Sequence, residues 1–165
     1  MPERGTVQRA KQKLRGGRSP STAAGEFVRE EMEHIREGKH GARSTQQAIA
    51  IGLSKARRAG VPLRPPRNGA SRTRRRAERD YEEGQQHPGA RPSRTRSRAT
   101  TRALRREPRG AASPRALASQ AHGAAVRRGA GARKASARKA ARTKGPALRK
   151  QAARKAAATR KDRDR

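Results

Sequence analysis

Large apolar side chains are scarce in this chain of 165 residues, which contains one Phe, one Tyr, no Trp and no Cys. Hydrophobic residues make up 30% of the chain, and many of them are alanines, whereas charged residues make up 35%. Because alanine buries little apolar area, the chain has little hydrophobic free energy to offset the conformational entropy that folding costs. We therefore expect a mainly α-helical protein with extensive disorder.

The chain carries a formal net charge of +32, and this charge is distributed unevenly. Residues 1–66 contain 14 basic and six acidic residues, whereas residues 67–165 contain 31 basic and seven acidic residues. A positive excess of this size favours polyanions as partners, and phosphate backbones are the first candidates.

Residues 19–63 are the part of the sequence that most resembles a folded module. A first helix is predicted after Ser19, Ser21 or Thr22, with Gly38 as its stop, because apolar residues recur there at helical spacing: Ala24, Phe27, Val28, Met32 and Ile35. We expect the glutamates of this helix to cover its exposed face: Glu26, Glu30, Glu31, Glu33 and Glu37.

A second helix is predicted more strongly. Ser44 and Gln47 fit a capping box, and an apolar stripe follows through Ile49, Leu53 and Ala56. Gly60 and Pro62 predict the end of this helix. Gly52, in the middle of the helix, costs about 1 kcal/mol relative to alanine, so it indicates either a close approach of the two helices or simple tolerance.

Together these signals predict a short helix–loop–helix hairpin over Ser21–Val61. A module of this size is near the limit at which isolated folds need extra support. We expect that support to come from a ligand or from a homodimer, whose interface would contain Phe27, Val28, Ile35, Ile49 and Leu53.

The rest of the chain is predicted to be organised around this hairpin. We expect a disordered basic arm over residues 1–18, a linker over 64–70, a weakly helical basic segment over 71–126, and a disordered Ala/Arg/Lys-rich tail over 127–165. Within residues 71–126, Ser71 can begin a short helix that ends at Gly84.

The basic tail contains a repeated Ala-Arg-Lys-Ala pattern with a spacing of five residues in its first two copies. In a helix this spacing turns each copy by about 140° relative to the last, so the charges would surround the axis. This arrangement suits sequence-independent contact with phosphates, and the residues we expect to make it are Arg133, Lys134, Arg138, Lys139, Arg149, Lys150, Arg154 and Lys155.

The sequence gives no indication of catalysis or of a cofactor. It contains no nucleophile elbow or phosphate-binding loop, and the four histidines (His34, His40, His87 and His122) lack metal-ligand spacing. We therefore expect neither an enzyme nor a metal site. No apolar run approaches the length of a membrane span, and the N-terminus has no signal-peptide pattern, so a cytoplasmic protein is the default expectation.

Two stretches of the sequence resemble a family of small, basic, uncharacterised bacterial proteins. They are GEFVREEMEHIREGKHG (residues 25–41) and QAIAIGLSKARRAG (residues 47–60). The resemblance covers roughly residues 19–63 and implies a bacterial source and a two-helix module, without an activity. The tail is similar in composition to the tails of bacterial linker-histone-like proteins.

These observations favour sequence-nonspecific binding of double-stranded DNA, in a nucleoid-associated or DNA-protecting role. The near absence of aromatic residues argues against stacking on single strands. Two alternatives remain at this stage: a protein-interaction or regulatory module whose hairpin docks a partner, and a basic protein associated with RNA or the ribosome.

Overall fold

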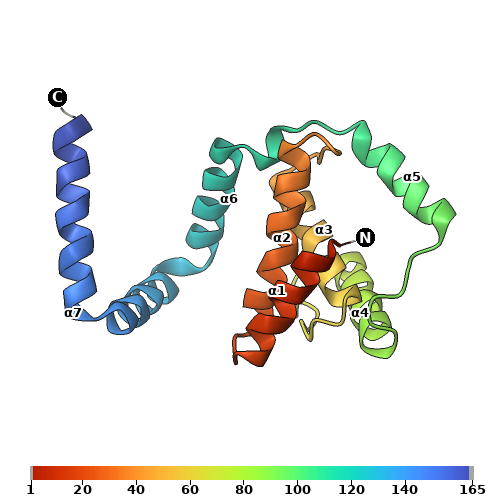
Figure 1. Cartoon of the computed structure of the whole chain (residues 1–165), viewed down its shortest axis with the longest axis horizontal. Coiled ribbons are helices and arrows are strands. Elements are labelled where there is room, and N and C mark those ends of the chain that lie inside the picture. Colours follow the sequence, from red (N-terminus) through yellow and green to blue (C-terminus); the bar gives the residue numbers. More distant parts are fainter. Residues whose placement is uncertain (1, 164–165) are drawn as a thin grey trace. The chain divides into compact units, whose positions relative to one another are not determined.

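The computed structural model describes residues 2–163 as a chain of helices, and this part of the chain contains no β-strand (Figure 1). It divides into two units, Met1–Gln120 and Ala121–Arg165, which are described separately. The helices are α1 (Arg4–Arg15), α2 (Pro20–Arg36), α3 (Thr45–Arg58), α4 (Ser71–Gln86), α5 (Arg94–Arg105), a 3-10 turn η1 (Gly110–Ala112), α6 (Pro114–Arg127) and α7 (Gly129–Arg163).

The two helices predicted for residues 19–63 are confirmed as α2 and α3. Ser19 is the N-cap of α2 and its hydroxyl accepts a hydrogen bond from the Thr22 amide at 3.3 Å, with Pro20 as the first helical residue. Ser44 caps α3 in the same way and accepts from the Gln47 amide at 3.2 Å. The Gln47 side chain accepts from the Arg43 amide at 2.7 Å, one residue before the position that a capping box uses.

Helix α1 packs along α2, where the sequence predicted a disordered arm (Figure 1). The disorder prediction is wrong over Arg4–Arg15, whereas Met1 lies outside the described residues. The segment has few apolar residues, but Ala10 is buried in a core cluster with Phe27 and Val61, and Val7 and Leu14 pack against that cluster. This small apolar stripe is enough to hold α1 against α2 because the two helices also form ion pairs, which are described below.

Helix α3 lies against α2 on another side, and Gly52 is at the point of contact. A Cβ atom at position 52 would lie 2.7 Å from the Val28 Cα and 2.9 Å from the Val28 amide nitrogen. The close approach of two helices therefore explains the glycine in the middle of α3. Beside this contact a second core cluster forms from α2, α3 and η1: Met32, Ile35, Ala42, Ala48, Ala111 and Ala112.

Helix α4 packs against α3 through its C-terminal half. Ala77, Asp80 and Gly84 are buried, and the Ser54 hydroxyl of α3 donates to the Asp80 carboxylate at 2.6 Å. The predicted stop at Gly84 is wrong, because this glycine lies inside the helix, where it lets α4 approach the backbone of Arg57.

The segment after α5 returns to the loop between α2 and α3. The amide of Gly41 donates to the Leu104 carbonyl at 2.9 Å, and the amide of Ala42 donates to the Pro108 carbonyl at 2.9 Å. The Thr45 hydroxyl donates to the Ala111 carbonyl at 2.7 Å, which holds η1 on the end of α3. The chain thus closes over the loop that carries His40.

The fold class predicted from the sequence is wrong in its main point, because helices replace the expected extensive disorder. The tail, predicted to be disordered over 127–165, is helical through Gly129–Arg163, and its last residues, Asp164 and Arg165, lie outside the described part. Alanine, arginine and lysine all favour helix. The five-residue repeat leaves few like-charge pairs at a spacing of four, such as Lys134 with Arg138, so repulsion is a smaller cost than expected.

Helix α7 is interrupted once. Gly145 has φ 66° and ψ 171°, and Pro146 follows it, so the helix consists of two parts joined at this pair. Among the described residues, no helix is long and apolar enough to cross a membrane.

The Gly52 contact leads to a prediction for stability. Gly52→Ala places a methyl group against the α2 backbone, which cannot move without separating the helices, and should lower the free energy of unfolding by about 1–3 kcal/mol. Gly25→Ala is the matched control, since it lies on an exposed part of α2 with no atom near its Cβ position, and should raise stability by about 0.5–1 kcal/mol. Urea titrations followed by circular dichroism compare the two. Equal effects in both variants would contradict a close contact at Gly52.

Candidate nucleic-acid interface

The acidic residues of α2 are mostly inside the protein, although the sequence predicted them on an exposed face. Glu26, Glu30 and Glu31 are buried, with exposed fractions of 3%, 2% and 0%. The prediction failed because it left this face of α2 without a neighbour, whereas α1 covers it. The cations that accompany these carboxylates come from three helices.

Glu26 is surrounded by three basic side chains. Arg9 Nε lies 2.8 Å from its Oε2, Arg29 Nη2 lies 2.7 Å from the same oxygen, and Lys13 Nζ pairs with Oε1. Burial alone would raise the pKa of Glu26, but the hydrogen bonds from Lys13, Arg29 and Arg9 outweigh it and lower the pKa to about 2. Glu26 therefore joins α1 to α2 as a charged group.

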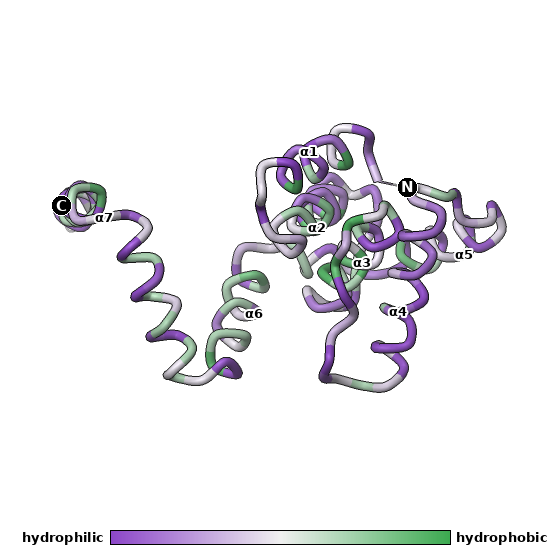
Figure 2. Tube along the Cα trace, turned by 90° about the horizontal axis from the view of Figure 1, so that it is seen from below, coloured by the Kyte–Doolittle hydropathy of each residue, from purple (hydrophilic) through white to green (hydrophobic). Residues whose placement is uncertain are grey.

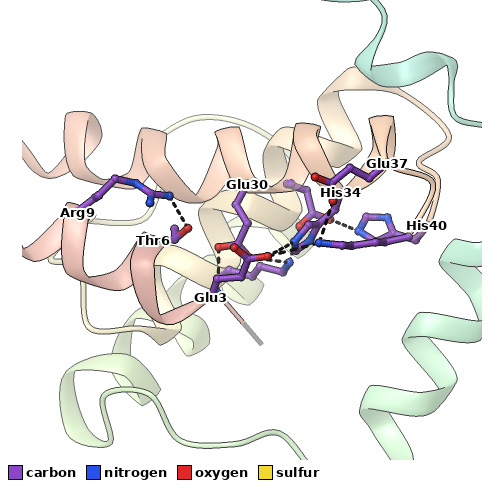
Figure 3. A network of polar contacts seen from close by, with 10 residues as sticks. Glu3, Thr6, Arg9, Glu30, His34, Glu37 and His40 are labelled. Atoms are coloured by element: carbon purple, nitrogen blue, oxygen red, sulfur yellow. Dashed lines mark hydrogen bonds and ion pairs between the residues drawn. The ribbon is translucent and has the colours of Figure 1, made fainter.

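Glu30 and Glu31 are held from the other side by α3. Lys55 Nζ lies 2.5 Å from Glu31 Oε2 and 3.8 Å from Glu30 Oε1, while the Glu3 amide donates to Glu30 Oε2 at 3.1 Å. Figure 3 shows Glu3 and Glu30 close together, with His34 and His40 farther along the same network. Glu26, Glu30 and Glu31 are thus paired within the first three helices.

The first half of α4 has a more basic surface. Five arginines of this helix are exposed, and four of them, Arg72, Arg75, Arg76 and Arg79, fall within an arc of about 100° at 100° per residue, with Glu82 and Glu83 following toward the C-terminal end. The buried residues of α4 lie outside this arc. Figure 2 shows α4 as hydrophilic along most of its length.

Helix α5 has a still more regular basic face. Arg94, Arg98 and Arg102 are four residues apart, and adding Arg105 and Arg106 gives five exposed arginines within an arc of about 120°. The helix contains no acidic residue. Within residues 2–162, no carboxylate lies at ion-pair distance from these five arginines or from the four of α4. These nine residues form what we call the arginine faces.

The phosphate contacts predicted in the tail all lie on α7 and are exposed: Arg133, Lys134, Arg138, Lys139, Arg149, Lys150, Arg154 and Lys155. The first four precede the interruption at Gly145 and the last four follow it. In each half they surround the helix axis, as the repeat spacing predicts. The structure therefore does not bring them together on one face.

The residues predicted for a dimer interface are used within one chain. Phe27 and Ile35 are fully buried in the two core clusters, and Val28, Ile49 and Leu53 are partly buried against them. In this fold Phe27 and Ile35 present no surface to a second copy. The homodimer itself stays a prediction.

Sequence reasoning missed the arginine faces and the contact between two histidines. The i, i+4, i+8 spacing of Arg94, Arg98 and Arg102 could have indicated a basic helical face, but because of its low apolar content this region was predicted only as weakly helical. His34 and His40 are six residues apart, and their ring centroids lie 6.1 Å apart only because the loop after α2 folds back. Their spacing in sequence gave no indication of this contact.

Comparison with protein-family models, with curated proteins and with solved structures gives no match to this chain. The resemblance to small basic bacterial proteins stays a prediction.

The charged state of Glu26 leads to a prediction for stability against pH. The pKa of Glu26 is lowered from 4.5 to about 2. Its ionised form therefore contributes at most about 3 kcal/mol to the free energy of unfolding. This contribution is fully present above about pH 4.5 and is lost as the pH falls toward 2. Glu26→Gln should remove that contribution at pH 7 and flatten the acid limb of the stability curve. Urea titrations between pH 7 and pH 3 measure it.

Glu33→Gln is the control for this measurement, because Glu33 lies on an exposed position of the same helix. It should leave both the stability at pH 7 and the acid limb nearly unchanged. If Glu26→Gln and Glu33→Gln give superimposable curves, the ion-pair cluster does not join α1 to α2 in the way described.

Proposed function

We propose that this protein binds double-stranded DNA through its phosphate backbone, without reading base sequence, in a nucleoid-associated or DNA-protecting role. The observation that carries the proposal is the pair of arginine faces on α4 and α5, which are exposed and have no carboxylate partner within residues 2–162. Such a surface is costly to leave unneutralised and is suited to phosphate.

The spacing of the α5 arginines favours a backbone over a compact anion. Residues four apart on a helix are separated by about 6 Å along its axis, so Arg94, Arg98 and Arg102 form a row. A row of guanidinium groups matches successive phosphates of one strand, and each guanidinium can bind a phosphate with two hydrogen bonds. A single small anion would engage only one member of the row.

The composition supports duplex binding without sequence readout. Reading the major groove uses side chains such as Asn and Gln presented with arginine, and the α5 segment contains neither. With one Phe, one Tyr and no Trp, the chain offers almost no stacking platform for unpaired bases. The cations of α7, which surround its axis, add contacts whose strength depends on the number of charges and not on their register.

The test is a salt series of binding titrations on a duplex DNA of mixed sequence. Replacing Arg94, Arg98 and Arg102 by Gln should weaken binding and lower the slope of log K against log salt by about 3, since each phosphate contact contributes about 0.9. The matched control replaces Arg15, Arg18 and Arg43, three exposed arginines of the first three helices and their connections. It changes the net charge equally but should alter the slope by less than about 1.

Equal losses in both triple variants would mean that total charge alone determines binding, and the arginine faces would then have no special role. Circular dichroism of each variant shows whether the helices are retained. The same titrations on double-stranded RNA test the choice of polyanion: tighter binding to RNA at every salt concentration would contradict the assignment to DNA.

A prediction about α7 follows from the repeated pattern of its charges. Replacing Arg133, Lys134, Arg138 and Lys139 by Gln, or Arg149, Lys150, Arg154 and Lys155 by Gln, removes the same number of charges with the same angular distribution. Both variants should lower the salt slope by the same amount, up to about 3.6. A loss confined to one half, measured in the same titrations, would show that α7 has a single local site.

A further inference from the structure

Three groups able to bind a metal ion converge where α2 meets the loop that follows it. The ligand atoms of Glu31, His34 and His40 all lie within 4.8 Å of one another. Glu31 is fully buried, and the two imidazole side chains have exposed fractions of only 13% and 12%. Figure 3 shows both histidine side chains directed into the same network.

The orientation of His40 is fixed by its second ring nitrogen. Its Nδ1 lies 3.0 Å from the Gly41 carbonyl oxygen, which can only accept, so the proton is on Nδ1. Histidines that bind metals usually donate this second N–H to a backbone carbonyl or a carboxylate. In the neutral ring, Nε2 therefore carries a lone pair, and this atom faces Glu31.

The contact between His40 and Glu31 is close but is not a hydrogen bond. His40 Nε2 lies 3.2 Å from Glu31 Oε1, yet neither oxygen of this buried carboxylate has a partner with hydrogen-bond geometry among the described residues. An imidazole nitrogen and a carboxylate oxygen that lie this close without a hydrogen bond can both act as ligands of a common cation. Four ligands around a zinc ion at about 2.0–2.1 Å are separated by distances close to this one.

The charge around the cluster also favours a divalent cation. Glu3, Glu30 and Glu31 supply three carboxylates and Lys55 supplies one ammonium group, while Lys39, 3.5 Å from Glu3, lies closer to Glu37 at 2.9 Å. With neutral histidines, two negative charges are left over, and uncompensated charge beside buried carboxylates is costly. An ion with charge +2 would balance them.

We propose that Glu31, His34 and His40 form a binding site for a zinc-type divalent transition-metal ion. Glu31 binds through Oε1, since its Oε2 is already paired with Lys55. Two imidazole nitrogens and one carboxylate oxygen form a ligand set suited to Zn²⁺. Glu3 Oε1 accepts a hydrogen bond from His34 Nε2 at 3.1 Å, so this nitrogen is protonated in the metal-free chain, and His34 would bind the ion through Nδ1 or after losing that proton. The ion joins α2 to the loop over which the segment after α5 closes.

The test is calorimetric titration of the full chain, without a histidine tag, with ZnCl₂. We expect one Zn²⁺ per chain and a rise in Tm on binding. His34→Gln, His40→Gln and Glu31→Gln should each weaken binding at least tenfold. The control is the double variant His87→Gln with His122→Gln, which removes the two histidines outside the cluster and should bind Zn²⁺ like the natural sequence.

Failure to bind Zn²⁺, or unchanged binding by His34→Gln and His40→Gln, would overturn the proposal and leave His40 only as a neighbour of Glu31. A second measurement does not depend on the folding of variants. In the natural sequence, Zn²⁺ should shift the imidazole ¹⁵N resonances of His34 and His40, while those of His87 and His122 stay in place. Shifts confined to His87 or His122 would also overturn it.

Discussion

The fold depends on the burial of three carboxylates along α2. Burying Glu26, Glu30 and Glu31 is unfavourable unless cations accompany them, and those cations come from elsewhere in the chain: Arg9 and Lys13 from α1, and Lys55 from α3. Each ion pair therefore fixes one helix against α2. The apolar clusters, built largely of alanine, add contact area but few directional constraints. In a chain so poor in large apolar residues, ion pairs specify which helices are neighbours.

The same arrangement separates the charges of the molecule. Carboxylates that would otherwise neutralise the surface are enclosed between α1, α2 and α3, whereas the arginines of α4 and α5 remain outside without partners in the described chain. The net charge of the protein is therefore concentrated where a ligand can reach it. Composition alone shows the excess of charge, but only the packing shows which helices carry it on one face.

The sequence was sufficient for α2 and α3 because their signals are local. Ser19, Ser44 and Gly60 act within one turn of the chain, and each has the role that its position predicts. The helix from Ser71 was predicted with an earlier end, whereas α1 and α7 were expected to be disordered because neither has a long apolar stripe. Helix α1 depends on ion pairs across 13 to 17 positions, and α4 on contact with α3. The histidine contact likewise depends on a loop conformation that no spacing rule describes.

The interruption of α7 at Gly145 and Pro146 divides the basic helix into two helical segments. A continuous helix of this length could follow a curved polyanion only by bending its hydrogen-bonded backbone, whereas two segments joined at this pair can each align with a different part of it. If α7 contacts DNA as proposed, binding of the first segment would hold the second at a high effective concentration, so the pair would dissociate more slowly than either segment alone.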